Sequence, residues 1–218
     1  MLYELDAIMG SPVMATDGEI GSVRSFLFDD QSWKVGYLVV SAGNWLKLRD
    51  VVVPITALDK PDFTSKTCCA HLTREQVRKS PDMDAEKPFS CRKQMAMLDS
   101  SGAPATWVDP EYNLSSIPAE RQCPALTVKN FYLRNTTHML GYHVRAIRGE
   151  MGIVQGLVMD DTTWRLSYLD VKEDCWHKSL VSTRWVESVS WAKLQINLHR
   201  TRADNILKSR KEHHDRFE

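Results

Sequence analysis

Two glutamates stand at equivalent points of a recurring pattern and are the first candidates for chemistry. Glu19 lies in "GEIG" and Glu150 in "GEMG". Paired carboxylates act as general acid and base when their environments favour different protonation states. The two glutamates belong to different copies of the pattern, so the sequence does not set their separation. The alternative, a charge that stabilises a turn or protects a strand edge, is the one we expect.

Two acidic pairs, Asp29-Asp30 and Asp160-Asp161, offer the oxygen ligands that Ca²⁺ or Mg²⁺ requires. Calcium takes at least about six oxygens, and no further ladder of acidic residues follows either pair. Asp is also a frequent turn residue, because its side chain accepts hydrogen bonds from the backbone that follows it. We therefore expect hairpin turns here and no metal site.

The remaining signatures of catalysis or cofactor binding are absent from the sequence. His71 and His199 occupy equivalent positions, which favours a structural role. No "GxSxG" surrounds a serine nucleophile. The segment "GEIGSVRS" leads into a predicted strand, whereas phosphate-binding glycine motifs open a helix. We expect no catalytic residue and no cofactor, and hence a protein that is not an enzyme.

Four tryptophans are the candidate partner-binding residues: Trp33, Trp45, Trp164 and Trp176. Trp33 and Trp164 follow the acidic pairs, and the other two stand near the next loop. One interpretation is that they cap a hydrophobic core. The other is that they are partly exposed and anchor a partner, because Trp dominates the energetics of many interfaces. Base stacking is a third use, but little basic charge is interleaved with them.

An internal repeat positions all of these residues. The segment "ATDGEIGSVRSFLFDDQSW" at 15–33 returns 131 residues later as "AIRGEMGIVQGLVMDDTTW" at 146–164, with eight of nineteen positions identical and no gap. The offset becomes 128 after Trp45 and Trp176, as in the pair Val53 and Val181. A length change of this kind marks a surface loop.

Each copy predicts short strands followed by a helix. The segments before and after each acidic pair are rich in β-branched and aromatic residues, which favours a hairpin. "VVVPITAL" and "SLVSTRWVESV" predict strands broken at a Pro or Ser corner, and "SKTCCAHL" and "KLQINLH" predict a last strand. Thr73 with Gln76, and Thr201 with Asp204, then form capping-box patterns at a helix start.

These elements divide the chain into a first domain at 1–80, a connector at 81–128 and a second domain with a C-terminal helix at 129–218. The connector holds six of the nine prolines and one segment, 91–99, that could form a short helix. Trp107 and Tyr112 are its expected anchors. Each copy has a length near the lower limit for a self-sufficient domain, so docking between the copies or with another molecule would help both.

The composition excludes several classes of protein. Lys plus Arg and Asp plus Glu are both 28, so no overall charge draws the chain to nucleic acid or to an anionic membrane. The C-terminal stretch 199–218 is basic, as expected for a solvated helix or, alternatively, a phosphate-binding tail. The five cysteines lack C-x-x-C spacing, which favours reduced thiols. The sequence has no signal-peptide pattern and no apolar run near the ~20 residues that span a bilayer.

The pattern "TDGEIG…DD…W…YLVV…W…V…P" resembles the PRC-barrel family, which includes the cytoplasmic part of the photosynthetic reaction centre H subunit and a domain of a bacterial ribosome maturation factor. The whole chain is similar to bacterial proteins with two such barrels in tandem. The second copy departs from the pattern at Arg148, where the first has Asp17. The resemblance implies a mainly β fold of two small barrels, each closed by a short C-terminal helix.

The resemblance also implies a bacterial cytoplasmic setting and action through contacts with other macromolecules, with no shared catalytic residues. We therefore expect a protein interaction or assembly module that binds another protein or a second copy of itself. The alternative is an RNA- or ribosome-associated factor.

Overall fold

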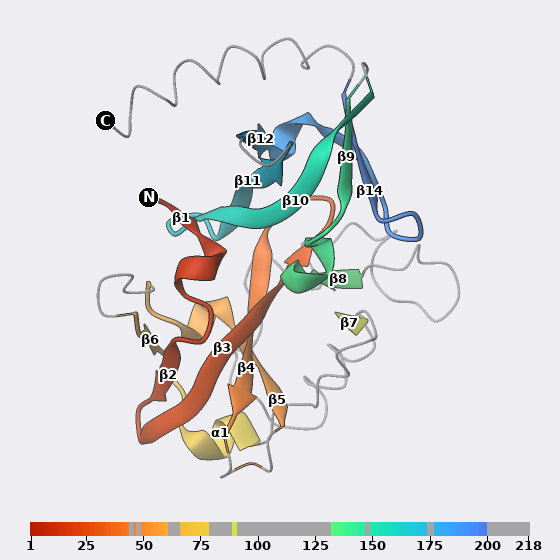
Figure 1. Ribbon diagram of the computed structural model, residues 1–218. Coiled ribbons are helices and arrows are strands. Elements are labelled where there is room, and N and C mark those ends of the chain that lie inside the picture. The colour runs from red at the N-terminus through yellow and green to blue at the C-terminus, as the bar shows by residue number, and fades with distance from the viewer. Residues whose placement is uncertain are drawn as a thin grey trace. The chain divides into compact units, whose positions relative to one another are not determined.

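The structure is a computed structural model of the 218-residue chain (Figure 1). It describes residues 1–43, 46, 49–60, 66–78, 89–90, 132–146, 149–173 and 177–199. The predicted connector helix at 91–99, its anchors Trp107 and Tyr112, and the helix predicted from Thr201 lie outside the described residues.

The fold is mainly β, with two seven-stranded sheets. The first runs in the order β5-β4-β3-β2-β6, and β8 pairs with β3 and with β7. Its strands are β2 (Pro12–Ala15), β3 (Gly18–Asp29), β4 (Val35–Ala42), β5 (Asp50–Pro54), β6 (Cys68–Cys69), β7 (Phe89–Ser90) and β8 (Tyr132–Asn135).

The second sheet runs in the order β12-β11-β10-β9-β14-β13, and β1 pairs with β10. Its strands are β1 (Leu2–Glu4), β9 (His143–Ala146), β10 (Gly149–Asp160), β11 (Arg165–Lys172), β12 (Lys178–Ser182), β13 (Val186–Ser190) and β14 (Gln195–Leu198). In each sheet the parallel pair, β2 with β6 and β9 with β14, occupies the same place in the order. The repeated sequence thus produces a repeated topology.

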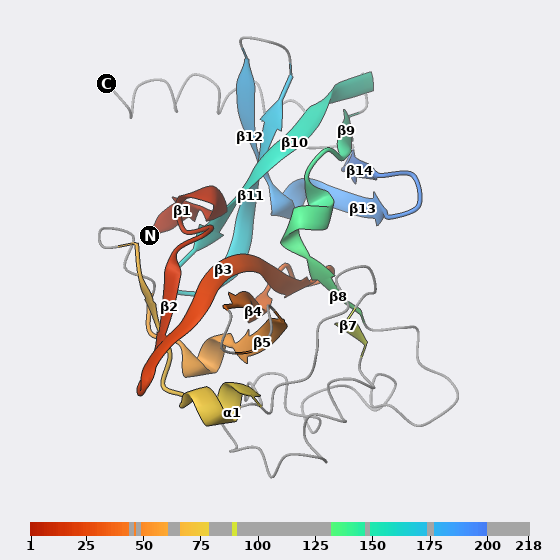
Figure 2. The same ribbon diagram turned by 60° about the horizontal axis from the view of Figure 1, so that its bottom comes forward.

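The chain's contacts divide it differently from the predicted boundaries. One compact unit, here called the C unit, contains residues 1–6, 137–160 and 166–218, and the other, the N unit, contains 7–136 and 161–165. The physical reason is strand pairing. β1 comes from the first repeat but pairs with β10 of the second, while β8 comes from the second repeat and pairs with β3 of the first (Figures 1 and 2).

The two exchanged strands use the same register. Leu2 pairs with Asp160 in the C unit, and Leu133 pairs with Asp29 in the N unit. These four residues are related by the offset of 131 found in the sequence. The first strand of each repeat therefore completes the sheet that is built mainly from the other repeat.

The predicted hairpins are confirmed. β3 pairs antiparallel with β4 across Asp30–Lys34, and β2 pairs with β3 across Thr16 and Asp17. β10 pairs antiparallel with β9 in the second sheet. Each of the pairs β2–β3 and β9–β10 contains a bulge next to the second glycine of the "GExG" motif.

The predicted strand breaks are also confirmed. β5 ends at Pro54 and leads into the 3-10 helix η3 (Ile55–Ala57), because Pro lacks the N–H that a longer ladder would need. β12 leads into η7 (Thr183–Trp185), where the Ser182 side chain accepts a hydrogen bond from the Arg184 N–H. Two further 3-10 helices, η1 (Leu5–Ala7) and η6 (Thr136–Met139), follow the exchanged strands.

The helix predicted after the first repeat is α1 (Arg74–Arg78). The Thr73 N–H donates to Gln76 Oε1 at 2.9 Å, and the Gln76 N–H donates to Thr73 Oγ1 at 3.3 Å. This reciprocal pair is a capping box, as the sequence predicted. Asp17 adds a third bond, because its Oδ1 accepts the Arg74 N–H at 2.7 Å. The second repeat has Arg148 in place of Asp17, so it lacks this acceptor.

The two sheets differ in how their faces are covered. Ser25, Val39 and Val52 form a cross-strand row on β3, β4 and β5, and each is at most 1% exposed. β4 is thus buried on both faces. The equivalent row in the second sheet includes Asp170 and Leu180, which are only partly buried. β11 accordingly shows the alternation of a strand with one wetter face.

Thr136 fastens the exchanged strand β8 to the N unit. Its Oγ1 accepts the N–H of Phe26 at 3.1 Å in a buried position, next to a bulge in β3. Thr136→Val keeps the shape but leaves this N–H without an acceptor, so we expect the free energy of unfolding to fall by about 1–3 kcal/mol. Chemical denaturation measures the loss. Thr136→Ser retains the hydroxyl and is the matched control; an equal loss in both variants would contradict the role of the bond.

Candidate functional site

The two candidate glutamates lie in different units. Glu19 is exposed on β3, opposite Met14 of β2. Glu150 lies on β10, and its Oε1 is 2.5 Å from Nδ1 of His143 on β9. Both side chains of this pair are at least half exposed. The contact is a cross-strand pair on a solvated face, which agrees with the edge-charge interpretation.

The acidic pair of the N unit stabilises a turn and an exchanged strand. The Asp29 carboxylate accepts the Gln31 N–H at 3.1 Å and the Ser32 hydroxyl at 2.7 Å. Asp30 forms an ion pair with Arg134 of β8, at 3.2 Å. Asp29 is 6% exposed, so its hydrogen bonds are needed to balance the burial of a charge. These contacts support the turn interpretation.

The second acidic pair, Asp160 and Asp161, contacts the N-terminus and a residue of its own turn. Asp160 lies 3.8 Å from the N-terminal ammonium of Met1, and Asp161 accepts a hydrogen bond from Thr162 at 3.0 Å. Within the described part of the chain, no group of three or more His, Cys, Asp or Glu residues is placed to hold a metal ion.

The tryptophans take different environments. Trp33 is 5% exposed and stacks on Phe28 with ring centroids 5.6 Å apart, so its burial favours the core interpretation. Trp164 is half-buried, and its carbonyl accepts the Val35 N–H at 2.8 Å. Trp45 and Trp176 lie outside the described residues. Partner binding by Trp164, Trp45 and Trp176 stays a prediction.

The equivalent histidines make equivalent backbone bonds. The His71 N–H donates to the Ala57 carbonyl and the His199 N–H to the Trp185 carbonyl, two pairs related by the offset of 128. Each bond joins the segment after a corner to the end of the last strand. These backbone bonds favour a structural role for the two positions.

Sequence reasoning missed a group of exposed apolar residues at one end of the C unit. Leu140, Ile153 and Leu194 are 43%, 40% and 52% exposed, and we call them the Leu194 cluster. Ile153 pairs with His143, whose N–H donates to the Leu194 carbonyl at 2.9 Å. The Gly141 N–H, directly after Leu140, donates to the Val154 carbonyl at 2.9 Å. The three residues therefore stand on neighbouring backbone segments.

The first repeat has no such cluster. The equivalent positions are Met9, which is half-buried, Ser22 and Lys66. Lys66 and Leu194 share an unusual backbone, with φ of 50° and 51°. The second repeat thus exposes apolar side chains at two positions where the first has a hydroxyl and a charge.

The Leu194 cluster adjoins a rigid aromatic pair. Trp191 and Tyr142 meet edge to face with ring centroids 5.7 Å apart. Trp191 lies in the turn between β13 and β14 that also carries Lys193 and Leu194. Comparing the two copies position by position was the signal available in the sequence. The exposure itself required the structure, because a Leu on a strand end is usually buried.

Cys68 and Cys69 are both free thiols, and Cys68 is buried whereas Cys69 is exposed. Burial, and then the neighbouring Cys69, raises the pKa of the Cys68 thiol to about 11. At pH 8 the folded protein thus holds Cys68 as the unreactive thiol, and the thiolate forms only as the pH approaches that value. We expect iodoacetamide to modify Cys69 first and Cys68 only after unfolding, as read by peptide mass spectrometry. Equal rates at the two sites would contradict this.

Among the described residues, no helix has the length and apolarity that a membrane crossing requires. Comparison with curated proteins returns no match. The family model of the PRC-barrel domain matches residues 2–65, from β1 to the segment after η3. The match includes β1, although this strand pairs with β10 in the C unit. Residues 2–65 are therefore similar to the PRC-barrel domain family.

Proposed function

We propose that this protein is a non-enzymatic interaction module that binds another protein through the Leu194 cluster. In this proposal both repeats are PRC-type barrels in tandem, each closed by a short C-terminal helix. Its setting in a bacterial cytoplasm and its likeness to the reaction centre H subunit remain expectations from the family resemblance.

The Leu194 cluster is the observation that carries the proposal. Covering a large aliphatic side chain contributes about 1.5–3 kcal/mol, and here three of them are 40–52% exposed. Apolar exposure that is contiguous marks interaction surfaces, and these three residues stand on neighbouring backbone segments. Trp191 and Tyr142 give this surface a rigid support, because their rings restrain each other.

The residues around the cluster indicate the chemistry of the partner. Lys193 and Arg145 are exposed cations, and Glu150, directly opposite Arg145, pairs with His143. An apolar centre with a cationic rim fits a protein surface that has an apolar centre and acidic residues at its edge. We therefore favour a protein of this kind as the partner.

Affinity capture with matched variants tests the proposal. Leu194→Lys places in the second repeat the residue that the first has, and Met14→Lys removes an apolar residue that is 36% exposed in the N unit. A partner held by wild type and by Met14→Lys should be retained at least about tenfold less by Leu194→Lys. The purified pair is then measured by calorimetry. Equal retention by all three proteins would overturn the proposed site.

The backbone conformation at Leu194 is unfavourable for a leucine, so this residue makes the fold less stable than an Asn would. Its φ of 51° is a left-handed conformation that costs a Leu about 1–2 kcal/mol and that Asn tolerates better. Leu194→Asn should therefore raise the free energy of unfolding by about 1 kcal/mol while weakening partner binding. Leu194→Lys should weaken binding without this gain, because Lys has the same backbone restriction. Thermal unfolding measures the first effect, and a loss of stability in Leu194→Asn would contradict it.

The alternative, an RNA- or ribosome-associated role, depends on the basic stretch 199–218, of which the structure describes His199. RNA binding would appear as an affinity that falls with salt with a slope of several counterions. Such a slope, combined with retention of binding in Leu194→Lys, would favour this alternative over a protein partner.

A further inference from the structure

We infer that β1 is an exchangeable strand, and that its partner is a second copy of this chain. In the exchanged dimer, β1 of each copy adds to β10 of the other copy in the register seen here. This inference goes beyond the proposed function, because it uses a different surface from the Leu194 cluster and a second copy of the chain as the partner.

Within one chain, β1 of the first repeat already pairs with β10 of the second repeat. Leu2, Tyr3 and Glu4 pair with Asp160, Met159 and Val158, three positions in all. Residues 1–6 belong to the C unit and the chain continues into the N unit at Ala7. The main-chain hydrogen bonds of a strand do not depend on which copy supplies it. A second copy therefore offers β10 an identical strand, as in domain swapping.

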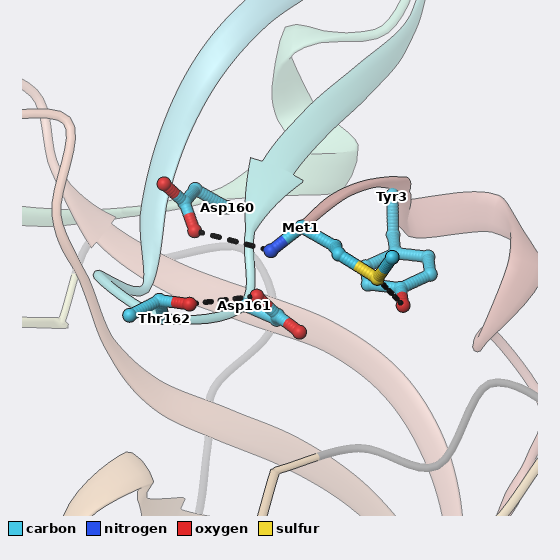
Figure 3. A network of polar contacts seen from close by, with 5 residues as sticks. All are labelled: Met1, Tyr3, Asp160, Asp161 and Thr162. Carbon is cyan, nitrogen blue, oxygen red and sulfur yellow. Dashed lines mark hydrogen bonds and ion pairs between the residues drawn. The ribbon is translucent and has the colours of Figure 1, made fainter.

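β1 is weakly held. Met1 and Leu2 are 79% and 52% exposed. The Met1 ammonium is 3.8 Å from the Asp160 carboxylate, and both groups are open to water at 84% and 31% exposure (Figure 3). Such an exposed pair contributes at most about 1 kcal/mol. The Tyr3 hydroxyl contacts the Met1 sulfur within β1 itself, so this bond does not hold the strand to β10 (Figure 3).

β8, the equivalent strand, is firmly held. Leu133 is 1% exposed, and the Thr136 hydroxyl accepts the buried Phe26 N–H. Arg134 and Asp30 form an ion pair in which the side chains are 21% and 25% exposed. β1 is also followed by a buried residue, Leu5, but this position offers β10 no hydroxyl. Of the two exchanged strands, β1 is therefore the one that detaches.

Exchange between chains depends on concentration. A strand tethered to its own chain competes at an effective concentration of about 1 mM for a short linker. The closed monomer thus dominates in dilute solution, and exchanged dimers form as the protein approaches that concentration. Each dimer regains both β1–β10 pairings, so its cost is mainly the entropy of association.

A cross-strand disulfide, formed in a mixture of unlabelled and ¹⁵N-labelled full-length chains, tests the inference. Leu2→Cys with Asp160→Cys places two thiols at directly opposed residues, whose Cβ atoms suit a disulfide. Unlabelled and ¹⁵N-labelled chains are mixed, incubated, oxidised and digested. Mass spectrometry then reports whether each linked 2–160 peptide pair joins one isotope or two.

We expect mixed-isotope pairs that rise at least about tenfold when the protein concentration rises ~100-fold. Single-isotope pairs at every concentration up to ~1 mM would overturn the inference. A second outcome would also overturn the inference: wild type forms a dimer in native mass spectrometry, but the cysteine variant yields no mixed-isotope pair. Another surface would then form the dimer. Glu4→Cys with Val158→Cys samples the other end of the strand if the first variant fails to fold. Adding Leu194→Lys should leave the mixed fraction unchanged, which separates this result from the fate of the proposed partner site.

Discussion

Val39→Asp should unfold the N unit, with a loss of about 4 kcal/mol in the free energy of unfolding. Val39 is 1% exposed in the middle of β4, between Ser25 and Val52. A carboxylate there would lose its hydration with no cation supplied in exchange. The second repeat carries Asp170 at the equivalent position and tolerates it.

The matched control is Asp170→Val, which makes the reverse exchange. Asp170 is 13% exposed and lies 3.6 Å from Nζ of Lys178, whose side chain is 66% exposed. Because Lys178 can return to water, we expect a change within about 1 kcal/mol. Urea denaturation followed by circular dichroism measures both variants. Similar losses in Val39→Asp and Asp170→Val would show that the two sheets do not differ as described.

Gly21→Ala should lower the free energy of unfolding by about 3 kcal/mol or more, because the backbone of β4 passes directly over this residue. A Cβ on Gly21 would overlap the Ser41 carbonyl oxygen and lie 2.9 Å from the Ala42 Cα. Neither atom belongs to a flexible side chain, so the strand itself would have to move. Gly21 also lies beside the β2–β3 bulge, and glycines at such positions commonly permit a close backbone approach.

Gly152→Ala should have the same effect in the C unit. Its Cβ would overlap the Lys172 carbonyl oxygen and lie 2.9 Å from the Glu173 Cα. Gly149→Ala is the control, since Gly149 also has a positive φ, 125°, but a Cβ there meets no atom within 4 Å. Thermal unfolding of the three variants separates the steric effect from the cost of placing alanine at a positive φ. A Gly149→Ala loss equal to the others would refute the close-approach explanation.

Local features of the fold could be predicted because neighbouring residues determine them. The Asp29 turn depends on side chains within three residues, and the Thr73–Gln76 capping box closes over a single helical turn. Pro54 ends β5 through its missing N–H. The hairpin on either side of Asp29 follows from the same short-range rules.

The candidate site was less accessible from the sequence. Residue type alone suggests the four tryptophans as partner-binding residues, yet Trp33 is 5% exposed and lies in the core. The amino-acid sequence does not reveal Leu194 as a site residue, because it predicts neither the φ of 51° nor the 52% exposure of this residue. Both depend on how the β13–β14 turn is placed against β9, which is a contact between segments about fifty residues apart.

The sequence by itself determined that a strand-rich unit occurs twice, where its hairpins turn and where its strands break, because these depend on short-range hydrogen bonds and on pattern. Tertiary structure alone decided that β1 completes the sheet with β10 and that β8 completes the sheet with β3. Strand pairing uses main-chain groups that nearly all residue types share. The residue types of β1 therefore do not specify with which of the two equivalent sheets this strand pairs. The choice depends on the long-range path of the chain.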